Sequence, residues 1–278
     1  MLGTVRSILY LACLAALAVG CSDNTPSTAD RTTPTPPQTA RETGTAPPKT
    51  ARRHSRVPLL MYHVIGEPRA GAPYPELYVS SSDFAGQMRW LERHGYSVVT
   101  LRAVWKHWHG RSDLPVRPIV ITFDDGYRGT ATRAAPTLAA HGWPGVLNLD
   151  LSNVKASEGF GENRIRRLVA AGWELDSHTL THPDLTTVDA GRLRREVAGS
   201  RMAIHKRFGV QAAFFCYPSG RFDKRVVNAV KAAGYLGATT TIYGLADRRD
   251  PYRMARVRIN RSDGVDGFAS KLTTLEER

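Results

Sequence analysis

The segment from Ile119 to Gly126 reads Ile-Val-Ile-Thr-Phe-Asp-Asp-Gly and carries the strongest strand signal in the chain. Its β-branched and apolar residues predict a buried strand over 119–123. Adjacent strand residues point to opposite faces, but a strand end that turns at a glycine can direct Asp124 and Asp125 to one site. One carboxylate could then bind a metal while the other acts as a base. The simpler alternative is an Asp-Gly turn without function.

Apolar runs and helical patterns alternate along the rest of the folded part. We expect further strands over residues 57–65, 96–101, 146–151, 173–176, 212–217 and 236–240. Helical spacing lies between these runs, and the longest predicted helix covers 189–208. This alternation is typical of a mainly parallel sheet, either an open sheet or a barrel. In barrels the chemistry lies at the C-terminal ends of the strands, so polar clusters at those ends are candidate sites.

A second polar cluster follows the predicted strand at 173–176. Residues 177–183 read Ser-His-Thr-Leu-Thr-His-Pro, which puts His178 and His182 four residues apart. The proline and the threonines favour a loop over a helix, and no Glu follows His178 as it would in the helical metalloprotease motif. Two histidines and one carboxylate leave open positions on a divalent metal, as a hydrolytic site requires. The alternative for two neighbouring histidines is ordinary packing.

The N-terminal residues predict a targeting signal and not a part of the fold. The chain is almost wholly apolar from Ile8 to Val19, and small residues then precede Cys21. This pattern resembles a bacterial lipoprotein signal over residues 1–21, in which Cys21 is lipidated and anchors the protein to the membrane. A plain cleaved signal and an uncleaved anchor are the alternatives. All three place the protein outside the cytoplasm, either as a membrane-anchored lipoprotein or as a secreted protein.

The next segment predicts a linker. Residues 22–56 are rich in Thr, Pro, Ala, Ser and Arg and lack hydrophobic periodicity, so we expect a disordered Thr/Pro-rich tether. Residues 57–278 remain, which is enough for one domain with a sizeable core. The 3 cysteines are too few for a disulfide scaffold or for a four-thiolate zinc site.

The chain is basic, with 38 Lys and Arg against 25 Asp and Glu and a formal net charge of +13. Such a charge suits an anionic partner such as nucleic acid, a lipid surface or an anionic wall polymer. The basic residues are scattered, however, and no aromatic-basic recognition motif accompanies them. We therefore expect no nucleic-acid partner, and a soluble basic surface is the simpler interpretation of the charge.

The two polar clusters together carry a family resemblance. Residues 122–126, Thr-Phe-Asp-Asp-Gly, and residues 178–182, His-Thr-Leu-Thr-His, resemble motifs of the polysaccharide deacetylases, carbohydrate esterase family 4, whose members share the NodB-homology domain. Residues 215–220, Phe-Cys-Tyr-Pro-Ser-Gly, are similar to a third motif. The resemblance extends over roughly residues 57–278. It implies an α/β fold, the irregular (β/α) barrel of NodB-homology domains.

The resemblance also implies residue roles by position. Asp124 would be the general base, while Asp125, His178 and His182 would bind a divalent metal. We expect Zn²⁺, with Co²⁺ or Ni²⁺ as alternatives. Such a metal polarises the acetamide carbonyl and lowers the pKa of bound water, whose proton the base removes. The backbone N–H of Ser219 would stabilise the oxyanion.

The sequence departs from the family pattern in two places. Cys216 replaces the Arg that usually opens the third motif and positions the base, and no His follows His205 to form the usual C-terminal Leu-x-His. A different group must then protonate the departing amine. Residues 59–63, Leu-Leu-Met-Tyr-His, resemble the branch that deacetylates exported poly-N-acetylglucosamine, where an N-terminal Met-Tyr-His supplies this acid. His63 is therefore the candidate acid, with a packing histidine as the alternative.

Three further features adjoin these motifs or attract attention. By the same resemblance, an Arg in the segment 251–257 would orient Asp124, with Arg256 as the first candidate and a surface ion pair as the alternative. Tyr127 and Tyr217 either line a sugar-binding groove or pack in the core, and the sequence favours neither. Residues 105–109, Trp-Lys-His-Trp-His, lie on a predicted helix and are expected to form an exposed helix face.

The sequence thus predicts a metal-dependent hydrolase that removes N-acetyl groups from an extracellular polysaccharide containing N-acetylglucosamine. The polymer is expected to be poly-N-acetylglucosamine or peptidoglycan, and the enzyme a monomer. An O-acetyl esterase that uses the same site is one alternative. A carbohydrate-binding pseudoenzyme is another, although the base and all three metal ligands are present.

Overall fold

The computed structural model describes residues 50–52, 55–156 and 159–277. The predicted signal peptide at 1–21, its Cys21 and most of the predicted linker at 22–56 lie outside these residues. Within the described ranges, no helix is long and apolar enough to cross a membrane.

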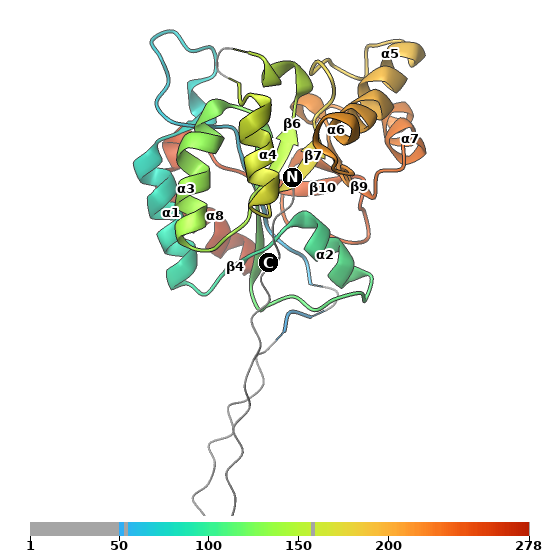
Figure 1. The fold of residues 1–278 in the computed structure, drawn as a ribbon. Helices are drawn as coiled ribbons and strands as arrows, with labels where there is room; N and C mark the ends of the chain where they lie inside the picture. The colour runs from blue at the N-terminus through green and yellow to red at the C-terminus, as the bar shows by residue number, and fades with distance from the viewer. Residues whose placement is uncertain (1–49, 53–54, 157–158, 278) are drawn as a thin grey trace, which may run out of the picture. The chain divides into compact units, whose positions relative to one another are not determined.

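The core of the fold is a closed barrel of parallel strands (Figure 1), as the family resemblance implied. Seven of the described strands form it: β1 (Leu59–Tyr62), β5 (Pro118–Asp125), β6 (Val146–Leu149), β7 (Glu174–Ser177), β8 (Phe214–Cys216), β9 (Gly237–Tyr243) and β10 (Met254–Arg258). They pair in the order β1-β10-β9-β8-β7-β6-β5, and β5 closes the ring by pairing with β1. β4 (Ser97–Val98) adds to β5 outside the ring, and β2 (Val64–Ile65) pairs with β3 (Tyr78–Val79) in a separate small sheet.

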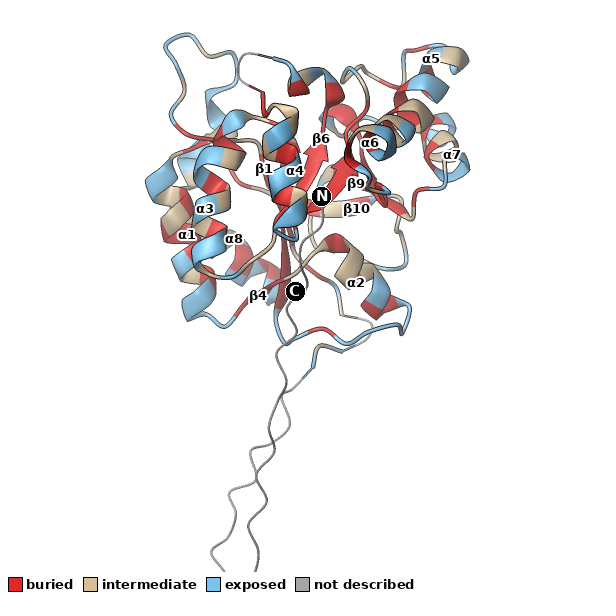
Figure 2. Cartoon of the chain, viewed as in Figure 1, coloured by how far each residue is buried: buried red, intermediate tan, exposed pale blue. Residues whose placement is uncertain are grey.

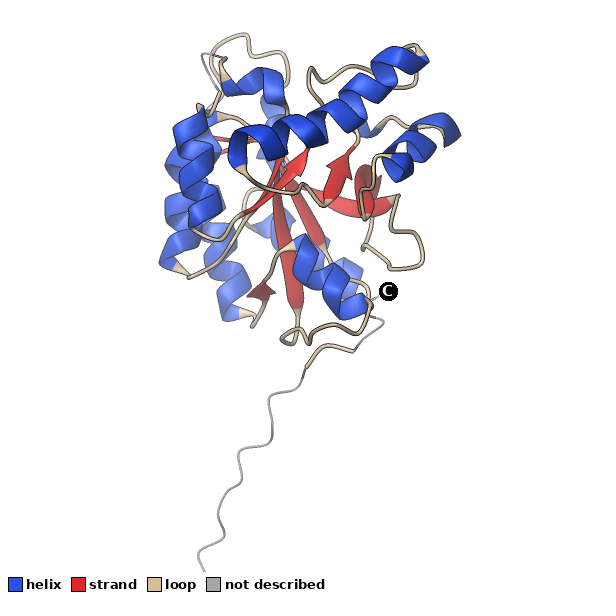
Figure 3. Ribbon diagram, turned by 45° about the vertical axis from the view of Figure 1, so that its right-hand side comes forward, coloured by secondary structure: helices blue, strands red, loops and turns tan. Residues whose placement is uncertain are grey.

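Helices surround this barrel, as Figure 3 shows in blue around the red strands. They are α1 (Ser81–Arg93), α2 (Leu101–Trp108), α3 (Ala135–Ala140), α4 (Glu162–Ala170), α5 (Ala190–Arg194), α6 (Ser200–Phe208), α7 (Lys224–Ala232) and α8 (Asp266–Glu276). The long helix predicted over 189–208 is present as α5 and α6, joined by a helical segment with π-type hydrogen bonds. The Asp189 side chain caps its start, and Gly209 ends it in the left-handed conformation.

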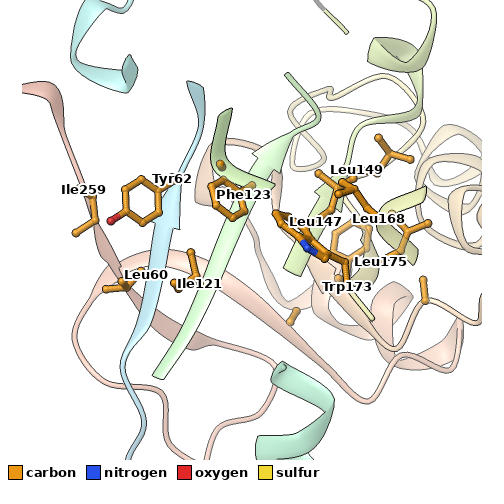
Figure 4. Close-up of a cluster of buried hydrophobic side chains, with 14 of the residues drawn as sticks. Leu60, Tyr62, Ile121, Phe123, Leu147, Leu149, Leu168, Trp173, Leu175 and Ile259 are labelled. Atoms are coloured by element: carbon orange, nitrogen blue, oxygen red, sulfur yellow. The ribbon is translucent and has the colours of Figure 1, made fainter. Parts of the chain in front are cut away.

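The alternation of side chains along β5 divides the core into two layers. Ile119, Ile121 and Phe123 pack outward against the helices in one buried cluster. Figure 4 shows Ile121 and Phe123 among the side chains of this cluster. Val120 points into the barrel and belongs to a second buried cluster. Because the side-chain period of a strand is two, Asp124 also faces the barrel interior. Figure 2 shows the strands as the most buried part of the fold.

Helix α2 closes the N-terminal end of the barrel, which we call the floor. Its Leu101 and Val104 pack with Leu59 and Val120, which lie near the starts of β1 and β5. The expectation of an exposed face over 105–109 is wrong in part, because the packing against the barrel buries two of its side chains. These are His107 and Trp108, which are 1% and 4% exposed.

The chain enters the domain at this floor. Thr50 forms an antiparallel bridge with Pro115, and the Trp108 Nε1–H donates to the carbonyl of Ser55 at 3.1 Å. Described residues from the C-terminal end of the predicted linker thus pack beneath the barrel.

Strand β10 has no counterpart among the predicted strands. Its sequence is Met-Ala-Arg-Val-Arg, so charged side chains occupy the positions that face the barrel interior. A search for apolar runs does not detect such a strand. β10 nevertheless supplies two arginines to the mouth of the barrel.

Candidate active site

A cavity of about 750 Å³ opens at the C-terminal ends of the strands. Every predicted site residue except Cys21 lines it: His63, Asp124, Asp125, Tyr127, His178, His182, Tyr217, Ser219 and Arg256. Segments that are distant in sequence therefore converge at one mouth of the barrel, as expected for this class of fold.

A backbone turn allows both adjacent aspartates to serve this cavity. Asp124 follows the strand alternation into the barrel, and Asp125 has a positive φ of 71°, which breaks that alternation. Gly126 continues the turn at φ 93°, where a Cβ would lie 2.9 Å from a methyl carbon of Leu149. The sequence therefore uses glycine here for both its conformation and its lack of a side chain.

Asp124 is held by a buried two-pronged ion pair with Arg256. The two guanidinium Nη atoms donate to Oδ1 and Oδ2 of Asp124, each at 2.8 Å. Asn148 on the neighbouring strand β6 donates to Oδ1 as well, at 2.8 Å. Burial alone would raise the pKa of Asp124, but the charge and hydrogen bonds of Arg256 outweigh it and hold this pKa well below its usual value. The carboxylate is therefore ionised and fixed in orientation.

Cys216 occupies the position on β8 where the family pattern has Arg. Its buried thiol lies 3.6 Å from Asp124 Oδ2, and an Nη of Arg256 lies 3.3 Å from its sulfur. The guanidinium thus reaches the same carboxylate from β10, a different strand from the one expected by the pattern.

Asp125, His178 and His182 form a compact group of nitrogen and oxygen donors. Asp125 Oδ1 lies 3.3 Å from His178 Nε2 and 3.6 Å from His182 Nε2, and the two Nε2 atoms are 3.1 Å apart. These separations match those between ligands that surround one cation at roughly 2.0–2.2 Å. His178 Nδ1 lies 2.8 Å from the carbonyl of Cys216, which favours a proton on Nδ1 and a lone pair on Nε2. The donor set therefore fits a divalent metal.

A second possible metal group shares His178. Asp124, His178 and Cys216 also offer donor atoms within 4.8 Å of one another. Asp124 is already neutralised by Arg256, however, and the thiol contacts the same ion pair. The group that contains Asp125 is thus the better metal site.

His63 follows β1 and faces Asp124 across the cavity. Its Nε2 lies 4.0 Å from Asp124 Oδ2, and its buried Nδ1 has no hydrogen-bond partner among the described residues. Burial lowers the pKa of His63, while the charge of Asp124 opposes this shift. The imidazole thus lies close to Asp124, with its Nδ1 available for a partner outside the described residues.

Ser219 and the two tyrosines differ in their surroundings. Ser219 has a positive φ of 53° in the 3-10 turn Pro218–Gly220, at the edge of the cavity. The Tyr217 ring is fully buried and its hydroxyl donates to the carbonyl of Tyr252 at 3.0 Å, which favours core packing of the two alternatives. Tyr127 is partly exposed on the cavity wall, where burial and the charge of Asp125 raise its pKa to about 12.

The sequence reasoning missed several polar residues of this site, among them Asn148, Asp150 and Arg258. Asn148 contacts the base, and Asp150 and Arg258 line the cavity. Asn148 interrupts the apolar run of the strand at 146–149, which is a detectable signal. The positions of Asp150 and Arg258 depend on strand register, and no local pattern reveals them.

The barrel and the contents of its mouth define the class of this protein. It is a closed parallel (β/α) barrel with carboxylates and imidazoles around one cavity, and Asp125, His178 and His182 could hold a metal ion there. The comparisons with known proteins name this class: the chain is a deacetylase enzyme. Residues 111–238 match the family model for polysaccharide deacetylase, so this segment belongs to the polysaccharide deacetylase family.

Three relatives illustrate this membership. YxkH of Bacillus subtilis, which carries the name of a polysaccharide deacetylase, is 27% identical over 216 residues, 77% of this chain and 75% of the relative. The poly-beta-1,6-N-acetyl-D-glucosamine N-deacetylase of Escherichia coli is 24% identical over 81% of this chain, which spans 40% of that enzyme. The crystal structure of a polysaccharide deacetylase from Bacillus cereus is 29% identical with a TM-score of 0.70, and covers 79% of this chain and 69% of that one.

Proposed function

We propose that this protein is a metal-dependent hydrolase that removes N-acetyl groups from an extracellular polysaccharide containing N-acetylglucosamine. The observation that carries the proposal is the pairing of an ionised, oriented Asp124 with the donor group Asp125, His178 and His182 in one cavity. The Escherichia coli relative, named for its action on poly-N-acetylglucosamine, supports this substrate class. Peptidoglycan carries the same acetamide and is the other candidate polymer.

The proposed roles follow from the contacts. A divalent metal at Asp125, His178 and His182 would polarise the acetamide carbonyl and lower the pKa of a water molecule. Asp124 accepts a proton from the attacking water, and Arg256 keeps its carboxylate oriented. The water oxygen bonds to the carbonyl carbon and the carbonyl electrons move to its oxygen, which gives a tetrahedral oxyanion. The carbon–nitrogen bond then breaks as the carbonyl forms again.

Two further groups complete the proposal. His63 hands a proton to the departing amine, so that an amine and acetate are the products. The Ser219 backbone N–H donates to the oxyanion that develops on the carbonyl oxygen. For His63, the position near Asp124 and the unpartnered Nδ1 support a role beyond packing.

The remaining parts of the proposal rest on the sequence. Zn²⁺ is the proposed metal, with Co²⁺ and Ni²⁺ as alternatives that the same N and O donors accept. Cys21 is the proposed lipidation site of an extracytoplasmic protein, followed by a linker at 22–56 and a catalytic domain at 57–278 that acts as a monomer.

The first test is acetate release from N-acetylglucosamine oligomers by the purified protein. We expect release that stops with EDTA, returns with Zn²⁺ or Co²⁺, and is lost in Asp124→Asn. Asp247→Asn, at an exposed ion pair with Arg249, is the matched control and should retain activity. Release that survives EDTA would contradict the metal. No release from oligomers of any length, together with release from O-acetylated substrates, would favour the esterase.

A further inference from the structure

Arg258 is a cation in the active-site cavity that the proposed reaction does not use. It lies two residues after Arg256 on β10, so both side chains share the interior face of that strand. Arg256 is neutralised by Asp124. Arg258 is partly exposed, lines the cavity, and makes no ion pair with a carboxylate of residues 50–52, 55–156 or 159–277. The cavity thus presents one guanidinium with no protein carboxylate bound to it.

The carboxylates that line the cavity are engaged elsewhere. Asp125 faces His178 and His182. Asp150 accepts hydrogen bonds from Ser152. A guanidinium free of such partners is suited to a planar carboxylate or to a phosphate, which it can bind with two parallel hydrogen bonds.

The cavity wall beside Arg258 also offers an aromatic surface. Glu76 Oε2 accepts hydrogen bonds from the backbone N–H and the hydroxyl of Ser262, at 3.1 and 2.7 Å. These bonds hold the loop that contains Tyr74 against the turn that follows β10. Tyr74 is 69% exposed and lines the same cavity as Arg258. An exposed ring suits the apolar face of a sugar, and the neighbouring cation suits a charged substituent on it.

We propose that Arg258 is a specificity-determining residue that binds an anionic substituent of the glycan, with Tyr74 stacking on the sugar that carries it. The enzyme then prefers N-acetylated sugars whose neighbours bear a negative charge over a neutral homopolymer. This inference rests on the proposed function, because the subsite adjoins His63 and Asp124 in the same cavity. A carboxylate and a phosphate share the required chemistry, and the test separates them.

The test compares matched substrates with the full chain. One is an oligosaccharide that alternates N-acetylglucosamine with a carboxylate-bearing sugar, and its twin has each carboxylate converted to a neutral methylamide. A third is an N-acetylglucosamine oligomer phosphorylated at its 6-hydroxyls, compared with the unmodified oligomer. We expect kcat/KM to be about 10- to 100-fold higher for at least one charged substrate than for its neutral partner. The preferred charged substrate identifies the anion.

Arg258→Gln should remove this preference by lowering kcat/KM on the charged substrate about 10- to 100-fold, with a change within about twofold on the neutral one. Arg258→Lys should retain part of the preference for the charged substrate, because lysine keeps the positive charge but lacks the planar guanidinium that donates two parallel hydrogen bonds. Arg261→Gln makes the same charge change at an exposed residue paired with Glu67, and should leave the preference intact. Equal losses on charged and neutral substrates in Arg258→Gln would overturn the inference.

Binding separates this inference from the proposed function. Affinities of the same oligosaccharides are measured by calorimetry with EDTA-treated protein, in which chemistry is not required. A charge preference in binding that is lost in Arg258→Gln would support the subsite even if no acetate were released. Acetate release from every substrate without a charge preference in rate or binding would overturn the inference and leave the proposed deacetylation standing.

Discussion

The buried pair of Asp124 and Arg256 decides what the site can do. A carboxylate that is 2% exposed would ordinarily take up a proton, and a fixed guanidinium prevents this. The sequence motif identified Asp124 as the candidate base. It identified Arg256 less directly, because Arg256 lies 132 positions away on another strand. Only the closure of the barrel brings the two together.

Removal of the guanidinium should therefore damage both fold and activity. In Arg256→Gln, Asp124 keeps a buried charge without its counter-ion, so we expect the free energy of unfolding to fall by about 3–5 kcal/mol. We also expect kcat to fall by about 100-fold or more, since the base loses its orientation. Denaturant melts and acetate release measure the two effects. Arg253→Gln, at an exposed ion pair with Asp250, serves as control. Full activity in Arg256→Gln would contradict the positioning role.

The proposed role of His63 as the acid leads to a second prediction for a single residue. An amine needs a proton to depart, whereas the alcohol of an ester is a better leaving group, so His63→Ala should reduce amide cleavage more than ester cleavage. We expect a loss of about 100-fold on N-acetylated oligomers and a clearly smaller one on an O-acetylated substrate. Rates on both substrates with one protein preparation provide the measurement. Equal loss on both would indicate that His63 packs or positions and does not supply the proton.

Strand β7 places two buried carboxyl groups within only four residues. Glu174 and Asp176 both lie buried on its interior face, and the strand then leads directly to His178. Asp176 accepts from the backbone N–H groups of Ala213 and Phe214, and Glu174 accepts from the N–H of Arg102 at the start of α2. The strand thus links the barrel floor to the loop that carries His178 and His182 through buried carboxyl groups.

The buried Glu174 should leave a signature in the pH dependence of stability. Burial, and after it the charge of Asp176, raise the pKa of Glu174 well above its usual value. A carboxyl with a raised folded-state pKa contributes fully below its unfolded pKa, near 4.3, and that contribution is lost as pH rises toward the folded value. The wild-type protein should therefore lose stability relative to Glu174→Gln as pH increases from about 4 to 7. Urea melts across this range measure the difference, and a parallel pH profile for both proteins would contradict it. Exposed Glu277→Gln is the control.

Elements with a strong local pattern could be predicted, and those that depend on partners could not. The strand at 119–123, its Asp-Asp-Gly end and the paired histidines after 173–176 follow from pattern and motif. β10 could not be predicted, because Arg256 is buried through its ion pair with Asp124, and Arg258 lines the open cavity. The burial of His107 was missed for a similar reason: its Nε2 lies 3.2 Å from the carbonyl oxygen of Arg52, which is 55 positions away in the sequence.

At the scale of the whole molecule, metal binding should stabilise the fold. The three donors come from the end of β5 and from the loop after β7, so one bound cation ties these segments together. A ligand at 100 times its dissociation constant contributes about 2.7 kcal/mol. We expect Zn²⁺ to raise the unfolding temperature of EDTA-treated protein by several degrees, and His182→Asn to abolish this rise. His141→Asn, at a partly exposed ion pair with Glu92, should respond as the wild type does. An equal rise in His182→Asn would exclude this site as the one that binds.

The entry of the chain at the barrel floor has a consequence for how the enzyme works in place. Thr50 pairs with Pro115, just before β5 begins, whereas Asp124 and Asp125 lie at the other end of the same strand. Any attachment through the N-terminal side therefore joins the domain at the end of the barrel opposite to the active-site mouth. If Cys21 is lipidated, the predicted tether at 22–56 leaves the mouth free of the attachment point, so that the domain can meet polymer in many orientations.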